Sequence, residues 1–172
     1  NVQNNTVVDN TGLYADGVNT PHDIPALLTV GGEYQLCKKL KVSGGYHHFF
    51  DSDAKMANNK QQYINGGVNE YLLGTEYGIN DVLMVSAGGQ ITRTGATDAY
   101  QSDMSFSLNS YSVGFGGAVN ITPDLRLNLA YFFTNYSPWT KASVSYNGTG
   151  VAGSDTYDRT NKVFGIGVEY KF

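Results

Sequence analysis

The sequence has little cysteine, little basic charge and no long hydrophobic run. Its single cysteine, Cys37, excludes a disulfide within the chain. Eleven lysines and arginines stand against fifteen aspartates and glutamates, with a net charge of −4. No basic patch of the kind that binds nucleic acid stands out. No apolar run approaches the roughly 18 residues that a membrane helix needs, which leaves strands as the way to cross a bilayer.

What the sequence does have is alternation, clearest in residues 163–172. Apolar or aromatic residues stand at 164, 166, 168, 170 and 172, and mostly small or charged residues stand between them. This period of two indicates a strand with one apolar face. An apolar outward face and a polar inward face are typical of transmembrane β-barrel strands. The chain also ends on an aromatic residue, Phe172, as bacterial outer-membrane barrels commonly do. A soluble β-sandwich is the alternative.

Relatives of this last strand recur along the chain. Gly-Val-Glu-Tyr ending at Tyr170 resembles the segments that end at Tyr34 and Tyr77, and more weakly the one that ends at Val119. The first three copies are each followed by a short polar turn and a second alternating run, so the repeating unit is a β-hairpin of about forty residues. Solenoid and propeller repeats lack this alternation. Aromatic residues make up 13% of the chain, which suits girdles at the two membrane interfaces.

We therefore expect an all-β fold, an antiparallel transmembrane β-barrel. Residues 1–25 are predicted to form an external loop, and residues 26–172 the barrel strands. Each strand has the roughly 9–11 residues that a tilted strand needs to cross the bilayer. The seven predicted strands are 26–36, 39–50, 70–79, 82–94, 105–120, 125–136 and 157–172.

The connections between these strands alternate in length. Those near 37–39, 79–82 and 121–124 are short, and those at 51–69, 95–104 and 137–156 are long. Outer-membrane barrels have short periplasmic turns and long external loops, which places Phe172 on the periplasmic side. Seven antiparallel strands do not close in the usual bacterial way. We expect further strands upstream, so that these seven are part of a larger barrel, rather than an eighth strand hidden in residues 1–25.

The alternation places six charged side chains inside the wall, towards the periplasmic ends of the strands. Charges in that position must pair or meet water. We expect an ion-pair layer that fixes strand register, and a proton or substrate relay is the alternative. The six residues are Glu33, Lys41, Glu76, Arg126, Glu169 and Lys171.

Large apolar side chains are predicted on the same face, nearer the outside. Such residues are unusual in a water-filled pore, but both an apolar ligand path and packing against a plug require them. A β-bulge in the strand 105–120 would turn two of them, Phe106 and Leu108, towards lipid. The candidate path residues are Phe49, Phe106, Leu108, Phe132 and Tyr136.

Catalytic and metal sites find little support. His47 and His48 are adjacent on a strand, so they point to opposite faces and cannot hold one metal together. Ser43 shares the face of His47 but lies about 13 Å away along the strand, too far for a nucleophile and its base. Asp51 and Asp53 could offer oxygen ligands to Ca²⁺, but a solvated loop is the favoured interpretation. No enzyme, metal or cofactor is expected.

Five runs of the sequence are distinctive in their order and spacing: residues 16–18, 23–31, 45–51, 71–77 and 163–170. They resemble the later strands of the FadL/TodX family of outer-membrane transporters for hydrophobic compounds. The likeness is strongest to the members in Bacteroides-type bacteria, and it covers nearly all of the chain.

The resemblance implies a function and a missing part. Members form a fourteen-stranded barrel with an N-terminal plug, and they pass long-chain fatty acids or aromatic hydrocarbons inward through a side opening in the wall. This chain matches about the last seven strands, so the plug residues that contact ligand have no counterpart here. The implied location is the bacterial outer membrane. The implied partners are the lipid bilayer, a hydrophobic small molecule and the N-terminal half of the same barrel, with no nucleic acid.

Two other functions stay open. The chain could be a complete barrel of about eight strands that serves as an anchor or adhesion protein, which needs a strand in the first 20 residues. It could, less plausibly, be a barrel enzyme that hydrolyses lipids, which needs a serine and a histidine from neighbouring strands.

Overall fold

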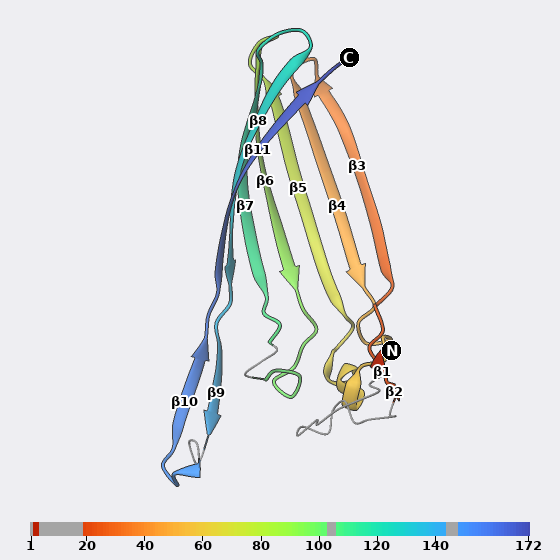
Figure 1. Cartoon of the computed structure of the whole chain (residues 1–172), viewed down its shortest axis with the longest axis vertical. Coiled ribbons are helices and arrows are strands. Elements are labelled where there is room, and N and C mark those ends of the chain that lie inside the picture. The colour runs from red at the N-terminus through yellow and green to blue at the C-terminus, as the bar shows by residue number, and fades with distance from the viewer. Residues whose placement is uncertain (1, 4–18, 103–105, 144–147) are drawn as a thin grey trace. The chain divides into compact units, whose positions relative to one another are not determined.

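The computed structural model describes residues 2–3, 19–102, 106–143 and 148–172, and strands make up almost all of its regular secondary structure (Figure 1). No helix in these ranges is long and apolar enough to span a bilayer. The seven long strands are β3 (Leu27–Cys37), β4 (Leu40–Phe49), β5 (Val68–Gly78), β6 (Leu83–Arg93), β7 (Ser110–Asn120), β8 (Leu125–Tyr136) and β11 (Thr160–Tyr170).

These seven strands form one antiparallel sheet in the order β11-β8-β7-β6-β5-β4-β3. Each strand pairs with the strand that comes next to it in the chain, apart from the hairpin inserted between β8 and β11. The all-β antiparallel fold predicted from the alternation is confirmed. The strands at the two ends of the order, β3 and β11, each have a single neighbour within this sheet, so their other sides carry backbone groups without a partner strand in it.

Two smaller features lie outside the seven-stranded sheet. A two-stranded pair joins β1 (Val2–Gln3) to β2 (Asn19–Thr20), and a 3₁₀ helix, η1, spans Ala57–Tyr63. Most of the predicted external loop 1–25, namely residues 1 and 4–18, lies outside the described residues.

The hairpin between β8 and β11 stands where the sequence predicted a long loop over 137–156. Strands β9 (Trp139–Ser143) and β10 (Gly153–Tyr157) are paired there. The rings of Trp139 and Tyr157 stack with centroids 5.1 Å apart, and the hydroxyls of Thr140 and Thr156 lie 3.0 Å apart. Aromatic and threonine pairs directly across two strands stabilise such a ribbon, although its sequence has no apolar alternation.

Two short turns show how local chemistry sets the strand ends. In the turn between β5 and β6, the Asn80 side-chain oxygen accepts hydrogen bonds from the backbone N–H groups of Val82 and Leu83, at 2.9 and 2.8 Å. In the turn between β7 and β8, Thr122 Oγ1 accepts one from the N–H of Asp124. Such side-chain acceptors stabilise tight turns, which explains why these connections stay short.

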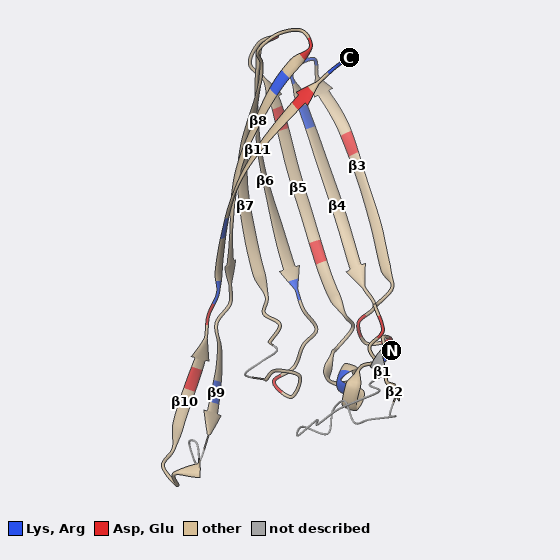
Figure 2. Ribbon diagram, in the orientation of Figure 1, with Lys and Arg blue, Asp and Glu red and all other residues tan. Residues whose placement is uncertain are grey.

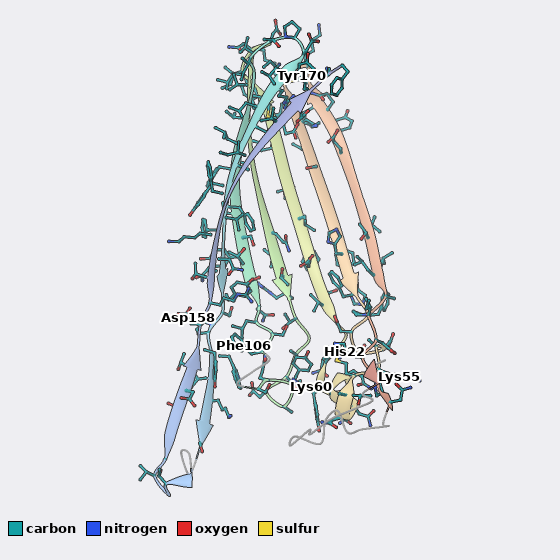
Figure 3. All side chains as sticks on the ribbon, viewed as in Figure 1. His22, Lys55, Lys60, Phe106, Asp158 and Tyr170 are labelled. Atoms are coloured by element: carbon teal, nitrogen blue, oxygen red, sulfur yellow. The ribbon has the colours of Figure 1, made fainter. Side chains whose placement is uncertain are left out.

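The strand predicted over 105–120 begins only at Ser110. The Gln101 side-chain amide donates to the Ser107 carbonyl at 2.6 Å and accepts from the Ser107 N–H at 2.7 Å. A side chain thus satisfies both backbone groups that strand pairing would use. Phe106 and Leu108 consequently lie in the segment that precedes β7, and the prediction that they belong to this strand is wrong (Figure 3).

The two faces of the sheet have inverted polarity. Along β5 and β6 exposed and half-buried positions mostly alternate, and most of the exposed positions are apolar. Leu73 is 71% exposed and Phe164 on β11 is 66% exposed, whereas Gly74 and Glu76 are half-buried. Figure 2 shows long uncharged stretches along β6 and β7. A protein that folds in water places its apolar residues the other way round.

The chain divides into two compact units. One comprises residues 1–30, 46–70 and 93–107, and the other comprises 31–45, 71–92 and 108–172. In the first unit Ile64 is buried and forms a bridge with Ala96. The Lys60 ammonium lies 4.4 Å from the centre of the Tyr100 ring. Burial raises the pKa of Tyr100 above its ordinary value, and the Asp51 carboxylate raises this pKa further.

The first unit yields a test of this packing at Gly67. Gly67 has φ of +75°, and a Cβ there would collide with the Phe49 carbonyl oxygen. Its neighbour Gly66 has φ of +71° with open space around it. We expect Gly66→Ala to cost about 1–2 kcal/mol of folding free energy, for backbone strain alone. Gly67→Ala should cost clearly more. Thermal denaturation in detergent, monitored by circular dichroism, measures the loss of stability in both variants. Equal losses would contradict the close packing of Gly67 against Phe49.

Candidate functional site

The face opposite the apolar one carries hydroxyls, amides, charges and glycines, and we call it the mixed face. Contacts between neighbouring strands establish its members. Lys41 meets Glu33 and Glu76, Ser112 meets Thr134, and Asn128 meets Glu169. By strand alternation the residues two positions away from these share the same face.

Three of the predicted inward charges form one ion-pair group. Lys41 Nζ on β4 lies 3.1 Å from Glu33 Oε2 on β3 and 2.8 Å from Glu76 Oε2 on β5. The group joins three neighbouring strands, as a layer that fixes register requires. Its contribution to register stays a prediction, because partly exposed ion pairs are worth little each.

The other three predicted charges lie at β8 and β11. Arg126 and Glu169 are directly opposite in register, and Asn128 connects them: its oxygen accepts from Arg126 Nε at 3.2 Å and its Nδ2 donates to Glu169. Lys171 follows the end of β11, and its N–H donates to the Asp124 carbonyl at 2.9 Å. Arg126, Glu169 and Lys171 line a hollow of about 510 Å³ beside the turns 79–82 and 121–124.

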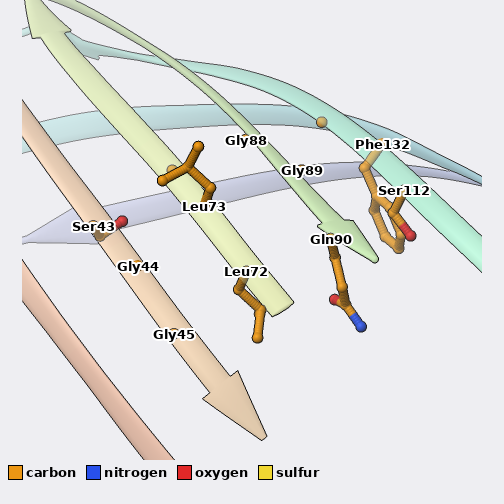
Figure 4. Close-up of a pocket in the computed structure, with 12 residues that line it drawn as sticks. Ser43, Gly44, Gly45, Leu72, Leu73, Gly88, Gly89, Gln90, Ser112 and Phe132 are labelled. Atoms are coloured by element: carbon orange, nitrogen blue, oxygen red, sulfur yellow. The ribbon is translucent and has the colours of Figure 1, made fainter. Parts of the chain in front are cut away.

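A second hollow, of about 440 Å³, lies on the mixed face of β4 to β8 and is mostly apolar (Figure 4). Four side chains lie on the same side of the sheet as the hollow, namely those of Leu72, Gln90, Ser112 and Phe132. The Leu73 side chain lies on the opposite side of the sheet. The residues that line it are Ser43, Gly44, Gly45, Leu72, Leu73, Gly74, Gly88, Gly89, Gln90, Ser112, Gly114 and Phe132.

The hollow is built from two rows of residues that follow the register across β6, β7 and β8. Gly88 lies opposite Gly114, and Gly114 lies opposite Phe132. A Cβ on Gly114 would lie 3.2 Å from the Phe132 Cβ, so glycine leaves room beside the ring. This first row gives a floor of bare backbone with one aromatic wall, which lets an apolar group approach the sheet closely.

The second row is polar and lies two residues along each strand. Gln90 is opposite Ser112, and Ser112 is opposite Thr134. The hydroxyls of Ser112 and Thr134 are 2.7 Å apart, and Gln90 Nε2 donates to the Thr92 hydroxyl at 3.1 Å. The hollow therefore has an apolar floor with hydrogen-bonding groups along one edge.

The predicted path residues fall in different places. Phe132 lines the hollow, and Tyr136 lies four residues further along the same face of β8. The Tyr136 hydroxyl accepts from Asn161 Nδ2 at 3.1 Å, and the Arg159 guanidinium lies 5.1 Å from the centre of its ring. Phe49 ends β4 and is half-buried.

The two remaining candidates are not on a strand. Phe106 and Leu108 precede β7, and Leu108 is buried with 8% exposure. The sequence interpretation missed Leu72 and Gln90 as lining residues. The alternation along each strand could have placed them on the mixed face. The sequence does not give the register between strands, which brings them to one hollow.

The histidines have separate partners, as their adjacency predicts. His47 Nδ1 lies 3.1 Å from Glu70 Oε2, and His48 Nδ1 lies 2.9 Å from Asn69 Oδ1. Since Asn69 and Glu70 are themselves adjacent, the two histidines face opposite sides. Asp51 accepts a hydrogen bond from the Val68 N–H, which uses one of its carboxylate oxygens locally. The described ranges hold no group of three or more His, Cys, Asp or Glu that could bind a metal.

The ion-pair group predicts a salt-dependent stability. Lys41→Met leaves Glu33 and Glu76 facing each other, so its thermal midpoint in detergent should fall below that of the wild type, most at low ionic strength. Glu33→Gln should lower the midpoint less, because the pair of Lys41 with Glu76 remains. Identical midpoints for Lys41→Met and the wild type across 0.01 to 1 M salt would contradict a role for these charges.

Comparison with known proteins bears on the fold. No family model and no curated protein matches the sequence. Among solved structures, the CymD monoaromatic hydrocarbon channel superposes with a TM-score of 0.58 and 14% sequence identity, over 87% of this chain and 36% of that channel's chain. The chain thus spans about a third of the channel's length. At this identity the likeness shows the fold, so the chain has the fold of part of a β-barrel channel.

Proposed function

We propose that this chain forms part of the wall of an outer-membrane β-barrel that admits hydrophobic small molecules. The observation that carries the proposal is the inverted sheet: an apolar face that is exposed, and a mixed face that holds an apolar hollow. The similarity to the fold of a hydrocarbon channel supports the same function class.

The apolar face fits the hydrocarbon of a bilayer. Phe164, Ile166, Val168 and Tyr170 are each 60% exposed or more along β11, and other strands of the sheet continue this face. Monomeric soluble proteins rarely expose so large an apolar surface. Within a bilayer core every backbone group must find its partner inside the protein, which a ladder of paired strands provides.

The hollow fits a small apolar ligand. Its volume lies within the range of about 300–1,000 Å³ that ligand sites usually have, and its lining combines apolar groups with a few polar ones. Binding would consist of partition onto the Gly88, Gly114 and Phe132 row, without covalent chemistry. Aromatic hydrocarbons and long-chain fatty acids are the two proposed classes of cargo, and the aromatic ring wall at Phe132 suits the first.

The proposed membrane wall needs strands beyond this sheet. Strands β3 and β11 end the sheet, and an open edge is not stable in hydrocarbon. The partners proposed are therefore the lipid bilayer, the hydrophobic ligand and the strands of an N-terminal half that would complete the barrel.

Thiol labelling tests the membrane placement. Cys37, exposed at the end of β3, serves as the internal control. In isolated membranes Cys37 should react with a water-soluble maleimide. A cysteine at Leu73, introduced with Cys37→Ser, should react at least tenfold more slowly, because hydrocarbon covers that face. A membrane-soluble maleimide should label it. Equal rates for the two cysteines with the water-soluble reagent would refute the placement.

Uptake tests the role of the hollow. Phe132→Ser combined with Leu72→Ser should lower uptake of radiolabelled ethylbenzene by the intact protein about thirtyfold, since each change removes on the order of 1 kcal/mol of apolar contact. Phe132→Leu keeps an apolar side chain and should retain most of the uptake. The amount of folded protein in the outer membrane is measured for each variant. Normal uptake by the double serine variant would show that the hollow does not take part in uptake.

A further inference from the structure

We propose that the hollow on β4 to β8 selects ring compounds that carry one hydrogen-bond acceptor, and that the hydroxyl of Ser112 makes this selection. The proposal rests on the proposed function and names the substrate class of the same site. A purely apolar ligand would need the floor of Gly88, Gly114 and Phe132 alone, whereas this site has a polar row beside that floor.

The register places the polar row next to the floor. Ser112 and Gly114 are two residues apart on β7, so their positions are about 7 Å apart on one face. Both residues line the hollow, together with Phe132, and Gln90 lines it from the neighbouring strand (Figure 4). A ring that rests on Gly114 beside Phe132 would direct one substituent towards Ser112.

The hydrogen-bond count leaves a donor for that substituent. Two hydroxyls have two O–H donors, and the 2.7 Å bond between Ser112 and Thr134 uses one of them. Neither hydroxyl makes another hydrogen bond to the described residues. Thr134 is 6% exposed, whereas Ser112 is half-buried and lines the hollow. When Thr134 donates to Ser112, the Ser112 O–H is free to donate to a ligand.

The chemistry of this edge defines the ligand class. An oxygen substituent such as a hydroxyl or a carbonyl can accept from Ser112, and the rest of the ring keeps its contact with Phe132 and Leu72. A methyl group in the same place would leave the donor without an acceptor, and an unsatisfied buried donor costs binding free energy. The site should therefore prefer an oxygen-bearing ring to a hydrocarbon of the same shape.

Two probes of nearly equal shape test this preference. Benzyl alcohol and ethylbenzene differ by a hydroxyl in place of a methyl, and their dissociation constants are measured by equilibrium dialysis with the intact, detergent-purified protein. Ser112→Ala should weaken benzyl alcohol binding about 3- to 10-fold, the value of one neutral hydrogen bond, and change ethylbenzene binding less than twofold. Ser112→Thr keeps a hydroxyl and should therefore retain the preference for benzyl alcohol.

Ser86→Ala is the matched control. Ser86 lies on the same face, opposite Gly116, one row beyond the glycine floor and outside the lining of this hollow. It should leave both dissociation constants unchanged. If Ser112→Ala weakens both probes equally, or neither, Ser112 only joins the strands and the proposal is overturned. If instead Phe132→Ser weakens neither probe, the hollow is not a ligand site and the proposed function itself fails.

Discussion

The backbone ladder of the sheet is the constraint on which the rest of the structure depends. Strand β8 pairs residue by residue with β7 on one side and with β11 on the other. This pairing satisfies the backbone groups without help from either face. The side chains are then free to divide, with apolar groups on one face and polar groups, charges and glycines on the other. A sheet that depended on buried side chains for its stability could not expose its apolar residues in this way.

Side-chain contacts add to the backbone ladder within each of the two units. At the short-turn end, the Lys41 group and the Arg126–Asn128–Glu169 group connect neighbouring strands with polar contacts. In the first unit, Gly67 and the Lys60–Tyr100 contact hold longer connections in packed conformations. Within the second unit, the mixed face of β4 to β8 carries several glycines, which is why a hollow exists there and a core does not.

The sequence predicted most of the ladder, and its failures have physical causes. Strand β8 has the predicted bounds, Leu125–Tyr136, because its apolar alternation is unbroken. The predicted strand 105–120 begins too early, because Phe106 and Leu108 continue the apolar alternation in the sequence. In the structure the Gln101 side chain instead hydrogen-bonds the backbone groups of Ser107. The β9–β10 hairpin was missed because its stability comes from cross-strand pairs such as Trp139 with Tyr157, which alternation of hydrophobicity does not reveal.

The sequence by itself determined which face each strand residue occupies, since alternation with a period of two is a local property of the chain. It therefore identified Lys41, Glu76 and Phe132 as sharing one face. Only the tertiary structure decided which residues of different strands meet. The rows Gln90–Ser112–Thr134 and Gly88–Gly114–Phe132 exist because of the register between β6, β7 and β8. Register depends on hydrogen bonds between strands and on the lengths of the turns that join them, and a shift of one residue would separate these partners and reverse every face.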